Sequence, residues 1–225
     1  MNITVVGRDK DEIEPILKSH GFFIAEKNFD FVVSYGGDGT LMKAESLYPG
    51  IPKIILKNSL ICKKCSLLPN EEILKKIKQK EYLIEEMPKL MATAKGQKLE
   101  GINDIVIHNK DPRHAMRYRV SVNGKIIGHE IIGDGIVVAT PFGSTGYYRS
   151  ITDSFFEIGL GMAFNNSIEQ SDHMILNDDV IIELEVTRGP AIIYTDNQEK
   201  TIELATGEKA RIGKGKNVAK IVTPQ

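Results

Sequence analysis

The first third of the chain alternates short apolar runs with amphipathic stretches. The apolar runs have the length of buried strands, and the stretches between and after them carry helical spacing or helix-end residues. The expected strands are residues 3–6, 29–34 and 53–56, and the expected helices are residues 9–19, 41–47 and 70–80. Strands that alternate with helices predict a parallel sheet with helical crossovers.

After about residue 82 the apolar runs are short and closely spaced, without helical stretches between them. This pattern is typical of an antiparallel, all-β domain. Asn123-Gly124, between two such runs, favours a tight hairpin turn. We therefore expect a domain boundary near residues 82–90. The expected strands are residues 90–94, 102–108, 118–122, 125–132, 135–139, 180–186, 191–195, 201–204 and 218–222.

Composition and charge narrow the classes of function. Of 225 residues, 41% are hydrophobic and 26% are charged, as in ordinary globular proteins. The net charge of −1 argues against a general nucleic-acid or membrane-surface binder. No apolar run approaches the ~20 residues that span a bilayer, and the N-terminus lacks the basic start of a signal peptide. Two cysteines are too few for a disulfide framework, so we expect a cytoplasmic protein in a reducing compartment.

The pentapeptide Gly36-Gly37-Asp38-Gly39-Thr40 lies between an expected strand and an expected helix. Its glycines allow the backbone to approach a ligand closely, and N–H groups at a helix start favour phosphate. Phosphates would repel a carboxylate, so Asp38 makes sense as a base that takes a proton from an attacking hydroxyl, or through a bridging metal ion. The pentapeptide matches neither a Walker A loop nor the Gly-x-Gly-x-x-Gly fingerprint. The alternative is a tight turn with a capping aspartate.

Two further clusters carry polar groups at strand ends. Asn103-Asp104 precedes an apolar run, and an amide beside a carboxylate can hold the two hydroxyls of a ribose. Gly133-Asp134-Gly135 is followed by residues 140–150, where hydroxyl side chains crowd an expected helix start and could contact a base and a ribose. Taken alone, each cluster is also compatible with ordinary polar residues at the end of a strand or with a capped loop.

In this order, the three clusters resemble the motif series of the NAD kinase family, whose members use ATP or polyphosphate. The resemblance covers residues 1–205, and the last two motifs separate it from the related lipid kinases, which share only the first. It implies phosphorylation of the 2′-hydroxyl of the adenosine ribose of NAD, giving NADP. The phosphoryl donor would be ATP or polyphosphate, and Mg²⁺ or another divalent metal would neutralise the transferred group.

The resemblance also assigns roles to individual residues. Asp38 would be the base, with Gly39 beside it, and the phosphates would lie against Gly36, Gly37, Gly39 and Thr40. Asn103 and Asp104 match the pair that holds the ribose hydroxyls of the nicotinamide half of NAD. The other substrate contacts that the resemblance implies are His114, Asp134, Thr145, Gly146, Tyr147, Tyr148, Arg149, Ser150 and Gln198. It assigns no metal-ligating side chain.

The implied fold is an N-terminal Rossmann-like α/β domain followed by a C-terminal antiparallel β-sandwich. We place the α/β domain at residues 1–85 and the β-sandwich at residues 86–205. Residues 206–225 are expected to return to the first domain. A neighbouring subunit commonly completes the site in this family, so the resemblance implies a homodimer or homotetramer.

The chain departs from the family pattern around the expected third strand. Residues 56–65 stand where the family has a glycine-rich stretch, and only Asn58 of that stretch is kept. Asp104 replaces a glutamate, Gly146 replaces an alanine, and Ile132 stands where a basic residue is common. The residues that could supply a missing cationic contact are Lys57, Lys63, Lys64, Arg117 and Arg149.

Cys62 and Cys65 have the spacing of half a zinc site or a redox pair. The five histidines are scattered without ligand spacing. We therefore expect two free thiols in a loop.

Two other functions stay open. The first is a related kinase that acts on NADH, a nucleoside or a lipid. The second is a non-catalytic module that binds NAD(P) as a sensor, which the altered glycine-rich stretch favours and the intact Asp38 disfavours. In none of these functions do we expect a nucleic-acid or membrane partner.

Overall fold

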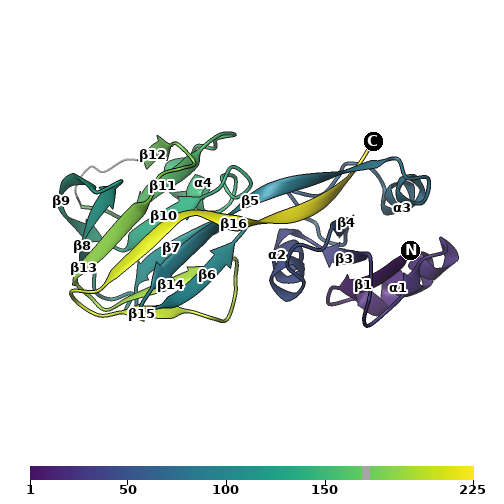
Figure 1. The fold of residues 1–225 in the computed structure, drawn as a ribbon, viewed down its shortest axis with the longest axis horizontal. Helices are drawn as coiled ribbons and strands as arrows, with labels where there is room; N and C mark the ends of the chain where they lie inside the picture. The colour runs from purple at the N-terminus through teal and green to yellow at the C-terminus, as the bar shows by residue number, and fades with distance from the viewer. Residues whose placement is uncertain (169–172) are drawn as a thin grey trace. The chain divides into compact units, whose positions relative to one another are not determined.

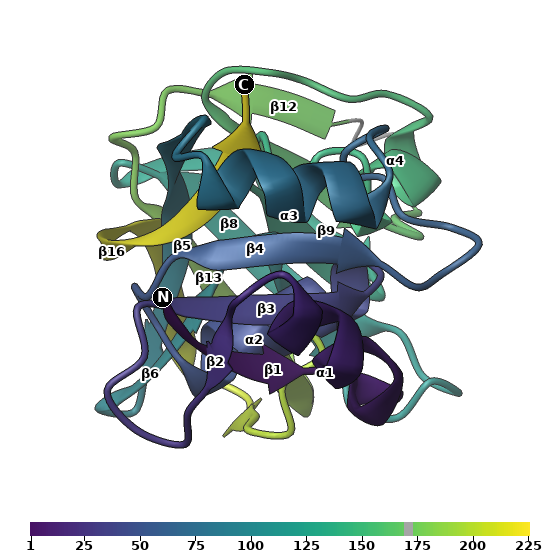
Figure 2. The ribbon, with the colours of Figure 1, turned by 90° about the vertical axis from the view of Figure 1, so that its right-hand side faces the viewer.

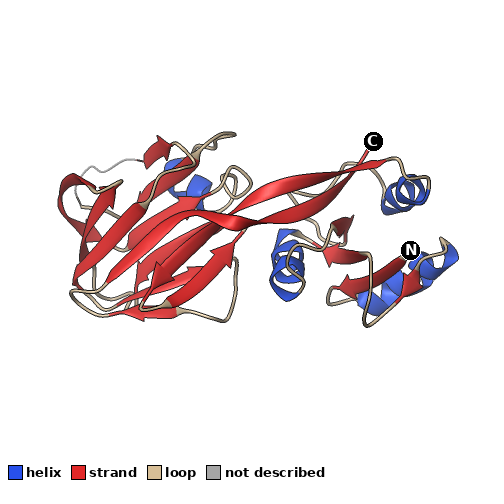
Figure 3. Cartoon of the chain, viewed as in Figure 1, coloured by secondary structure: helices blue, strands red, loops and turns tan. Residues whose placement is uncertain are grey.

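The computed structural model describes residues 1–168 and 173–225. It divides the chain into two compact units. The first unit contains residues 1–87 and 217–225, and the second contains residues 88–216. Figure 1 shows the elements of both units in chain order, and Figure 3 shows that helices are concentrated in the first. Within the described part of the chain, no helix is long and apolar enough to span a membrane.

The first unit contains a parallel sheet with the strand order β2-β1-β3-β4. The end of the last strand, β16, adds to it beside β4, where Ile221 and Val222 pair in parallel with Lys53 and Ile54. The strands are β1 (Asn2–Val6), β2 (Phe23–Ile24), β3 (Phe31–Gly36), β4 (Lys53–Lys57) and β16 (Lys209–Pro224).

Helices cover both faces of this sheet, as Figure 2 shows. Phe31 and Val33 of β3 share a buried cluster with apolar residues of α1 (Lys10–Ser19) and α3 (Asn70–Lys78). Val32, which points the other way, packs with Ala44 of α2 (Asp38–Leu47). Because successive residues of a strand point to opposite faces, the continuous apolar run of β3 is what a sheet covered on both sides requires.

The second unit consists of two antiparallel sheets. One has the order β12-β11-β10-β7-β14-β15, and the other contains β16, β13, β8 and β9 together with β5 and β6. The strands are β5 (Tyr82–Ala94), β6 (Gln97–Gly101), β7 (Asp104–Asn109), β8 (Met116–Val122), β9 (Lys125–Gly133), β10 (Gly135–Ala139), β11 (Leu160–Asn165), β12 (His173–Leu176), β13 (Ile182–Arg188), β14 (Ala191–Thr195) and β15 (Ile202–Leu204).

One large apolar core joins the two sheets. Ile105 and Ile107 of β7 and Ile136 of β10 lie in the same buried cluster as Tyr118 of β8 and Leu184 of β13. The opposite face of the β7–β10–β11 region is covered by α4 (Tyr147–Thr152), through the buried ring of Tyr148. The predicted fold class, α/β plus an antiparallel β-sandwich, is confirmed.

Among the boundaries that differ from the expected ones, two concern the glycine turn and the division into units. The helix expected at residues 41–47 begins at Asp38, so the last three residues of the Gly-Gly-Asp-Gly-Thr turn form its first turn. The expected C-terminal segment is divided, because residues 206–216 belong to the second unit and residues 217–225 to the first.

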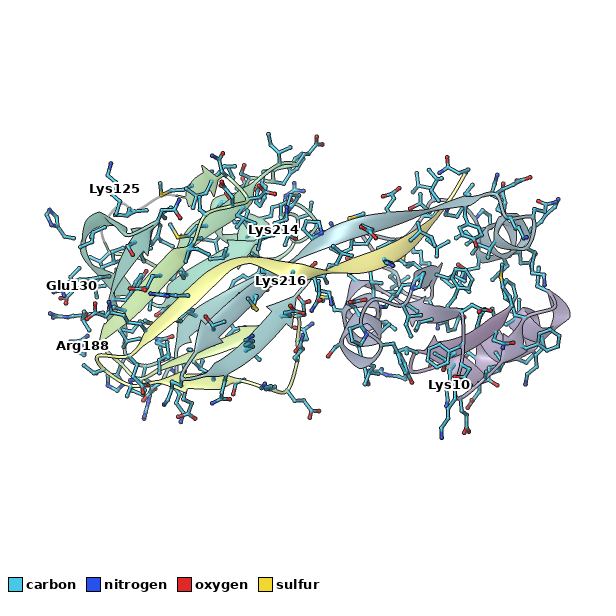
Figure 4. All side chains as sticks on the ribbon, in the orientation of Figure 1. Lys10, Lys125, Glu130, Arg188, Lys214 and Lys216 are labelled. Atoms are coloured by element: carbon cyan, nitrogen blue, oxygen red, sulfur yellow. A yellow bond between two sulfur atoms is a disulfide. The ribbon has the colours of Figure 1, made fainter. Side chains whose placement is uncertain are left out.

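β9 is an edge strand that carries charged side chains. Figure 4 labels Lys125 and Glu130 on this strand, and the Glu130 carboxylate lies 3.4 Å from Arg117 of the neighbouring β8. Charges on an edge strand oppose pairing with a further strand.

Candidate functional site

The Gly-Gly-Asp-Gly-Thr turn joins β3 directly to α2. β3 ends at Gly36, and Gly37 precedes the first helical residue, Asp38. A Cβ atom on Gly36 would lie 2.2 Å from the Thr40 hydroxyl oxygen, so only glycine lets the helix start this close to the strand. Asp38 therefore sits in the first turn of α2, where the helix dipole favours a negative charge.

A cleft of about 550 Å³ surrounds this turn in the first unit. Arg8, at the end of β1, and Lys43 of α2 contribute cations to its lining, and Asp9 contributes a carboxylate. Burial, followed by the charges of Glu12 and Asp9, raises the pKa of Tyr35, so its hydroxyl stays protonated. Cationic side chains beside a helix start form a suitable environment for phosphate.

Arg8 and Lys43 were not among the cations that the sequence suggested. Arg8 could have been found, because it follows the end of a parallel strand, and ligands of open α/β sheets bind outside the carboxyl ends of the strands. Lys43 lies on the helical stretch, and nothing in the sequence distinguishes it from other exposed lysines. Two of the suggested cations belong to the second unit, where Arg117 pairs with Glu130 and Arg149 lies over the Phe155 ring.

Asp38 is held by the segment that replaces the family's glycine-rich stretch. The backbone N–H of Lys63 donates to Asp38 Oδ2 at 3.0 Å, and that of Lys64 donates to Asp38 Oδ1 at 3.0 Å. Burial lowers the pKa of the Lys64 ammonium, and the Asp38 charge opposes this shift. A carboxylate has about four acceptor positions, so Asp38 can still accept a proton from a further donor.

Cys62 and Cys65 form a disulfide, with their Cα atoms 5.5 Å apart. The expectation of two free thiols is therefore wrong. Spacing alone could not separate a bonded pair from two free thiols, because the outcome depends on how the loop folds against Asp38. Cys62 Sγ lies 3.2 Å from Asp38 Oδ1.

The described residues contain no cluster of three or more His, Cys, Asp or Glu side chains that could hold a metal ion. Magnesium usually binds through one or two carboxylates together with substrate phosphates and water. The cleft offers that kind of site, since its lining acid is Asp9.

In the second unit, the carboxylate of Asp196 organises the Asn103-Asp104 motif. It accepts hydrogen bonds from the backbone N–H groups of Ile102 (2.5 Å), Asn103 (2.9 Å) and Asp104 (3.4 Å). The hydroxyl of Thr195 also donates to the carbonyl of Asp104. Sequence reasoning missed Asp196, although it lies at the end of a strand beside an Asn, where a turn is expected.

The third motif packs against the second. The backbone N–H of Thr140 donates to the carbonyl of Asn103 at 2.9 Å, and the Thr140 hydroxyl donates to that of Ile102 at 2.6 Å. A Cβ atom on Gly143 would lie 2.0 Å from the Asn103 carbonyl oxygen. Two motifs that are about 40 residues apart therefore meet within the second unit.

Two buried carboxyl groups have raised pKa values. Burial, followed by the charge of Asp196, raises the pKa of Asp104 to about 7. Burial raises the pKa of Asp196 to about 6, although its three backbone hydrogen bonds and the Lys89 charge act in the opposite direction. Carboxyl groups that titrate near neutral pH are a frequent property of functional sites.

The charge of Asp104 acts on two tyrosines, Tyr147 and Tyr194. Burial raises the pKa of Tyr147, with further contributions from the charges of Asp134 and Asp104. Burial, Tyr147 and Asp104 together raise the pKa of Tyr194 to about 12. We call Asp104, Asp134, Tyr147 and Tyr194 the acid–tyrosine cluster.

Three amide side chains hold parts of this cluster in place. Asp134 accepts hydrogen bonds from Asn109 Nδ2 (3.1 Å) and Asn166 Nδ2 (2.7 Å). The Tyr147 hydroxyl accepts one from Asn165 Nδ2 (2.9 Å). Asp104, Asp134 and Tyr147, which the sequence singled out, thus come together.

The remaining expected contacts lie in different surroundings. Tyr148 is fully buried and packs edge-on against Phe156, so it is the member of the tyrosine pair that belongs to the core. His114 is exposed, with Nδ1 3.2 Å from an Asp111 carboxylate oxygen. Gln198 donates through Nε2 to the Glu100 carbonyl at 2.8 Å.

The rest of the third motif lies at the start of α4. Gly146 is the residue before the helix, and Arg149 and Ser150 are exposed within it. Thr145 is half-buried. The Ser150 hydroxyl donates to the carbonyl of Tyr147.

Known proteins resemble this chain in sequence and in fold. An NAD kinase of Saccharolobus solfataricus is 33% identical over 151 residues, which cover 64% of this chain and 57% of that protein. An NAD kinase of Methanothermobacter thermautotrophicus is 27% identical over 154 residues, which cover 67% of this chain and 54% of that protein. The matched part of this chain thus spans little more than half the length of these relatives.

Two solved structures share the fold. The crystal structure of an NAD kinase from Archaeoglobus fulgidus in complex with ATP superposes with a TM-score of 0.80 at 21% identity, covering 100% of this chain and 94% of the other. The crystal structure of yeast NADH kinase complexed with NADH superposes with a TM-score of 0.78 at 14% identity. The match covers 100% of this chain and 84% of the other.

The sequence model of the ATP-NAD kinase C-terminal domain matches residues 102–223, more than half of the chain. The match includes Asn103-Asp104, the third motif and Asp196, which the structure brings together. The chain therefore belongs to the NAD kinase family.

Proposed function

We propose that this protein is an NAD kinase, which transfers a phosphoryl group to the 2′-hydroxyl of the adenosine ribose of NAD. The observation that carries the proposal is the position of Asp38, the first residue of α2, between Gly37 and Gly39, which line a cleft together with Arg8 and Lys43. A carboxylate at the start of a helix, one residue from the lining of a cationic cleft, suits a base that accepts the proton of the attacking hydroxyl.

The phosphoryl donor binds against the glycine turn in this proposal. Arg8 and Lys43 neutralise its phosphates, and the backbone N–H groups at the start of α2 orient them. A divalent metal such as Mg²⁺ would arrive with the donor phosphates, with Asp9 as an available carboxylate, and would neutralise the transferred group. ATP is the preferred candidate, because a neighbour in fold was solved with ATP. Polyphosphate is the alternative.

In the second unit, Asn103 and Asp104 bind ribose hydroxyls of the acceptor. Asp196 holds their backbone in place, and the half-buried Asn103 side chain is free to face a ligand. Because burial raises the pKa of Asp104 to about 7, its protonated form is populated at neutral pH. That form can donate to one hydroxyl oxygen as well as accept from another. Tyr147 and Asp134 line the same cluster and contribute further polar contacts.

A homodimer or homotetramer is part of the proposal. Exposed apolar side chains on the second unit, among them Phe155, Ile158 and Ile175, favour an interface between copies. Light scattering coupled to size exclusion measures the number of subunits directly.

A donor-and-acceptor panel tests the proposed function. The purified chain is incubated with Mg²⁺, with ATP or polyphosphate as donor, and with NAD or NADH as acceptor. Mass spectrometry then identifies the product. NADH is included because one neighbour in fold is an NADH kinase. Phosphorylated dinucleotide supports the proposal, whereas NAD binding without product in any combination favours a sensor.

A further inference from the structure

The disulfide loop and Asp38 form one local unit. The two N–H groups that hold the Asp38 carboxylate belong to Lys63 and Lys64, which are the two residues enclosed between Cys62 and Cys65. A disulfide that encloses only two residues limits the backbone conformations open to those two residues. The cross-link therefore acts on the same peptide groups that bind the carboxylate.

The sulfur atoms also face this carboxylate directly. Cys62 Sγ lies 3.2 Å from Asp38 Oδ1. A disulfide sulfur has no hydrogen to donate, whereas a thiol at the same place donates an S–H hydrogen bond. Reduction would therefore change both the backbone and the side-chain surroundings of Asp38.

Both cysteines of the disulfide lie at a cavity. Cys62 and Cys65 are half-buried and line a cavity of about 680 Å³ in the first unit. Exposed disulfides are the labile and regulatory ones. In a reducing compartment, which we expect for this protein, disulfides are usually transient and redox-sensing.

We propose that Cys62 and Cys65 form a redox-active site that reacts with dithiols and controls how Asp38 is held. In the oxidised form, the closed loop holds the carboxylate through the Lys63 and Lys64 N–H groups. In the reduced form, the loop opens, the Cys62 thiol moves away with it, and the carboxylate is released. The consequence for catalysis rests on the proposed NAD kinase function, in which a released Asp38 is free to turn toward the attacking hydroxyl. The reduced enzyme is then the more active form.

The redox step balances with a dithiol as the reductant. One thiolate of the dithiol attacks a sulfur of the pair, which breaks the Cys62–Cys65 bond and forms a mixed disulfide. The second thiolate of the dithiol displaces the protein sulfur and closes the reductant's own disulfide. Two electrons and two protons pass from the dithiol to the protein, which carries two thiols at the end.

The first experiment does not depend on enzyme activity. The full chain is equilibrated in buffers of reduced and oxidised dithiothreitol, and free thiols are alkylated and counted by mass spectrometry. Hydrogen exchange of the Lys63 and Lys64 amides is measured in both states. We expect two alkylated thiols after reduction and amide exchange that is faster by roughly tenfold, the factor for losing a hydrogen bond to a charged group. Unchanged exchange would overturn the proposal.

The second experiment measures turnover of the oxidised and reduced forms. The control is the Cys62→Ser/Cys65→Ser double variant, which removes both cysteines of the chain. We expect higher turnover after reduction in the wild type and no response in the double variant, whose turnover matches the reduced form. Equal or lower turnover of the reduced wild type contradicts the proposal. If neither form makes product but the amides still respond to dithiol, the kinase function fails and the redox control of Asp38 stands.

Discussion

The carboxylate of Asp196 accepts a hydrogen bond from the backbone N–H of Asn103 at 2.9 Å, across 93 residues of sequence. It also accepts from the N–H groups on either side of Asn103. One buried side chain thus accepts hydrogen bonds from three consecutive N–H groups at the start of β7. The end of β14 therefore determines the backbone conformation at the start of β7.

Replacing Asp196 tests this relationship. Asp196→Ala leaves three buried N–H groups without their acceptor, and we expect it to lower the free energy of unfolding by about 2–3 kcal/mol. Asp196→Asn keeps one acceptor oxygen, so its effect should be smaller. Urea unfolding measures both. Glu199→Gln, an exposed acid three residues further on, is the control.

The same variants separate a positioning role from a purely structural one. If Asp196 positions Asn103 and Asp104 for a ligand, Asp196→Asn raises the KM for NAD and leaves the KM for the phosphoryl donor unchanged. A lower turnover with both KM values unchanged would show that the variant acts only through loss of folded protein.

The pKa of Asp104 predicts a pH dependence of stability. Its folded-state pKa of about 7 lies above the usual value of 3.8, so the folded state binds the proton more tightly than the unfolded state. The resulting stability is fully present below pH 4 and is lost as the pH rises toward 7, by up to ~4 kcal/mol. Asp196 contributes in the same direction, because its pKa is also raised.

A single variant isolates this contribution. The side chain of Asp104→Asn cannot titrate. Between about pH 4.5 and about pH 8, the free energy of unfolding of this variant should therefore fall less than that of the wild type. Thermal unfolding at several pH values measures the difference. Parallel curves for the two proteins would mean that Asp104 is ionised in the folded state throughout this range.

Much of the fold could be predicted because pattern and packing agree locally. The continuous apolar run of β3 indicates a strand covered on both faces, and Asn123-Gly124 indicates a hairpin between β8 and β9. The long strands β5 and β16 were harder to predict. Their outer parts are exposed and carry mixed charges such as Glu86 and Lys220, so the alternation of apolar and polar residues is lost there.

Candidate site residues could be recognised in the sequence where a short local motif indicates its own backbone conformation. Asp38 stands out because glycines surround it, and Asn103 because it adjoins an apolar strand. Asp196 and Lys43 act through neighbours that are distant in sequence, and no local pattern reveals such contacts. The contact between the Cys62–Cys65 disulfide and Asp38 also joins residues that are distant in sequence, so no local pattern predicts it.

Two glycines of the third motif should respond differently to alanine. A Cβ atom on Gly143 would lie 2.0 Å from the Asn103 carbonyl oxygen, so Gly143→Ala must displace the Asn103 backbone. We expect a loss of about 1–3 kcal/mol in stability, as for other overpacked sites. On Gly146 the nearest atom would be 3.1 Å away, at the Gly143 carbonyl oxygen, and a small shift relieves the contact.

Gly146→Ala is therefore the matched control, and it also introduces the alanine that is usual in the family. It should keep nearly all stability and NAD binding, whereas Gly143→Ala should weaken NAD binding. Calorimetric titration with NAD compares the two. Equal losses at both positions would show that the Asn103 contact has no special importance.

Removing a cation from the cleft should change the KM for the phosphoryl donor and not the KM for NAD. Arg8→Ala and Lys43→Ala each remove a charge from the lining of the cleft. We expect each to raise the KM for ATP by roughly tenfold, the effect of losing one charge-assisted hydrogen bond, with the KM for NAD unchanged. Lys10→Ala is the control, because Lys10 is exposed on α1 and does not line the cleft (Figure 4). A higher KM for NAD alone would place the acceptor, not the donor, beside Arg8.

Asp38→Asn tests the proposed base directly. The amide keeps the size of the side chain and one acceptor oxygen, but it cannot take a proton from a hydroxyl. We expect turnover to fall by at least ~100-fold, the usual contribution of a positioned base, while the affinity for NAD changes little. A coupled assay with an NADP-specific dehydrogenase gives turnover, and calorimetric titration gives affinity. Asp11→Asn is the matched control, because Asp11 is an exposed acid in the first turn of α1.

Since the disulfide loop also contacts Asp38, exchange of the Lys63 and Lys64 amides is measured in the Asp38→Asn variant as well. Lost turnover with protected amides assigns the loss to the missing base, whereas near-normal turnover excludes Asp38 from that role.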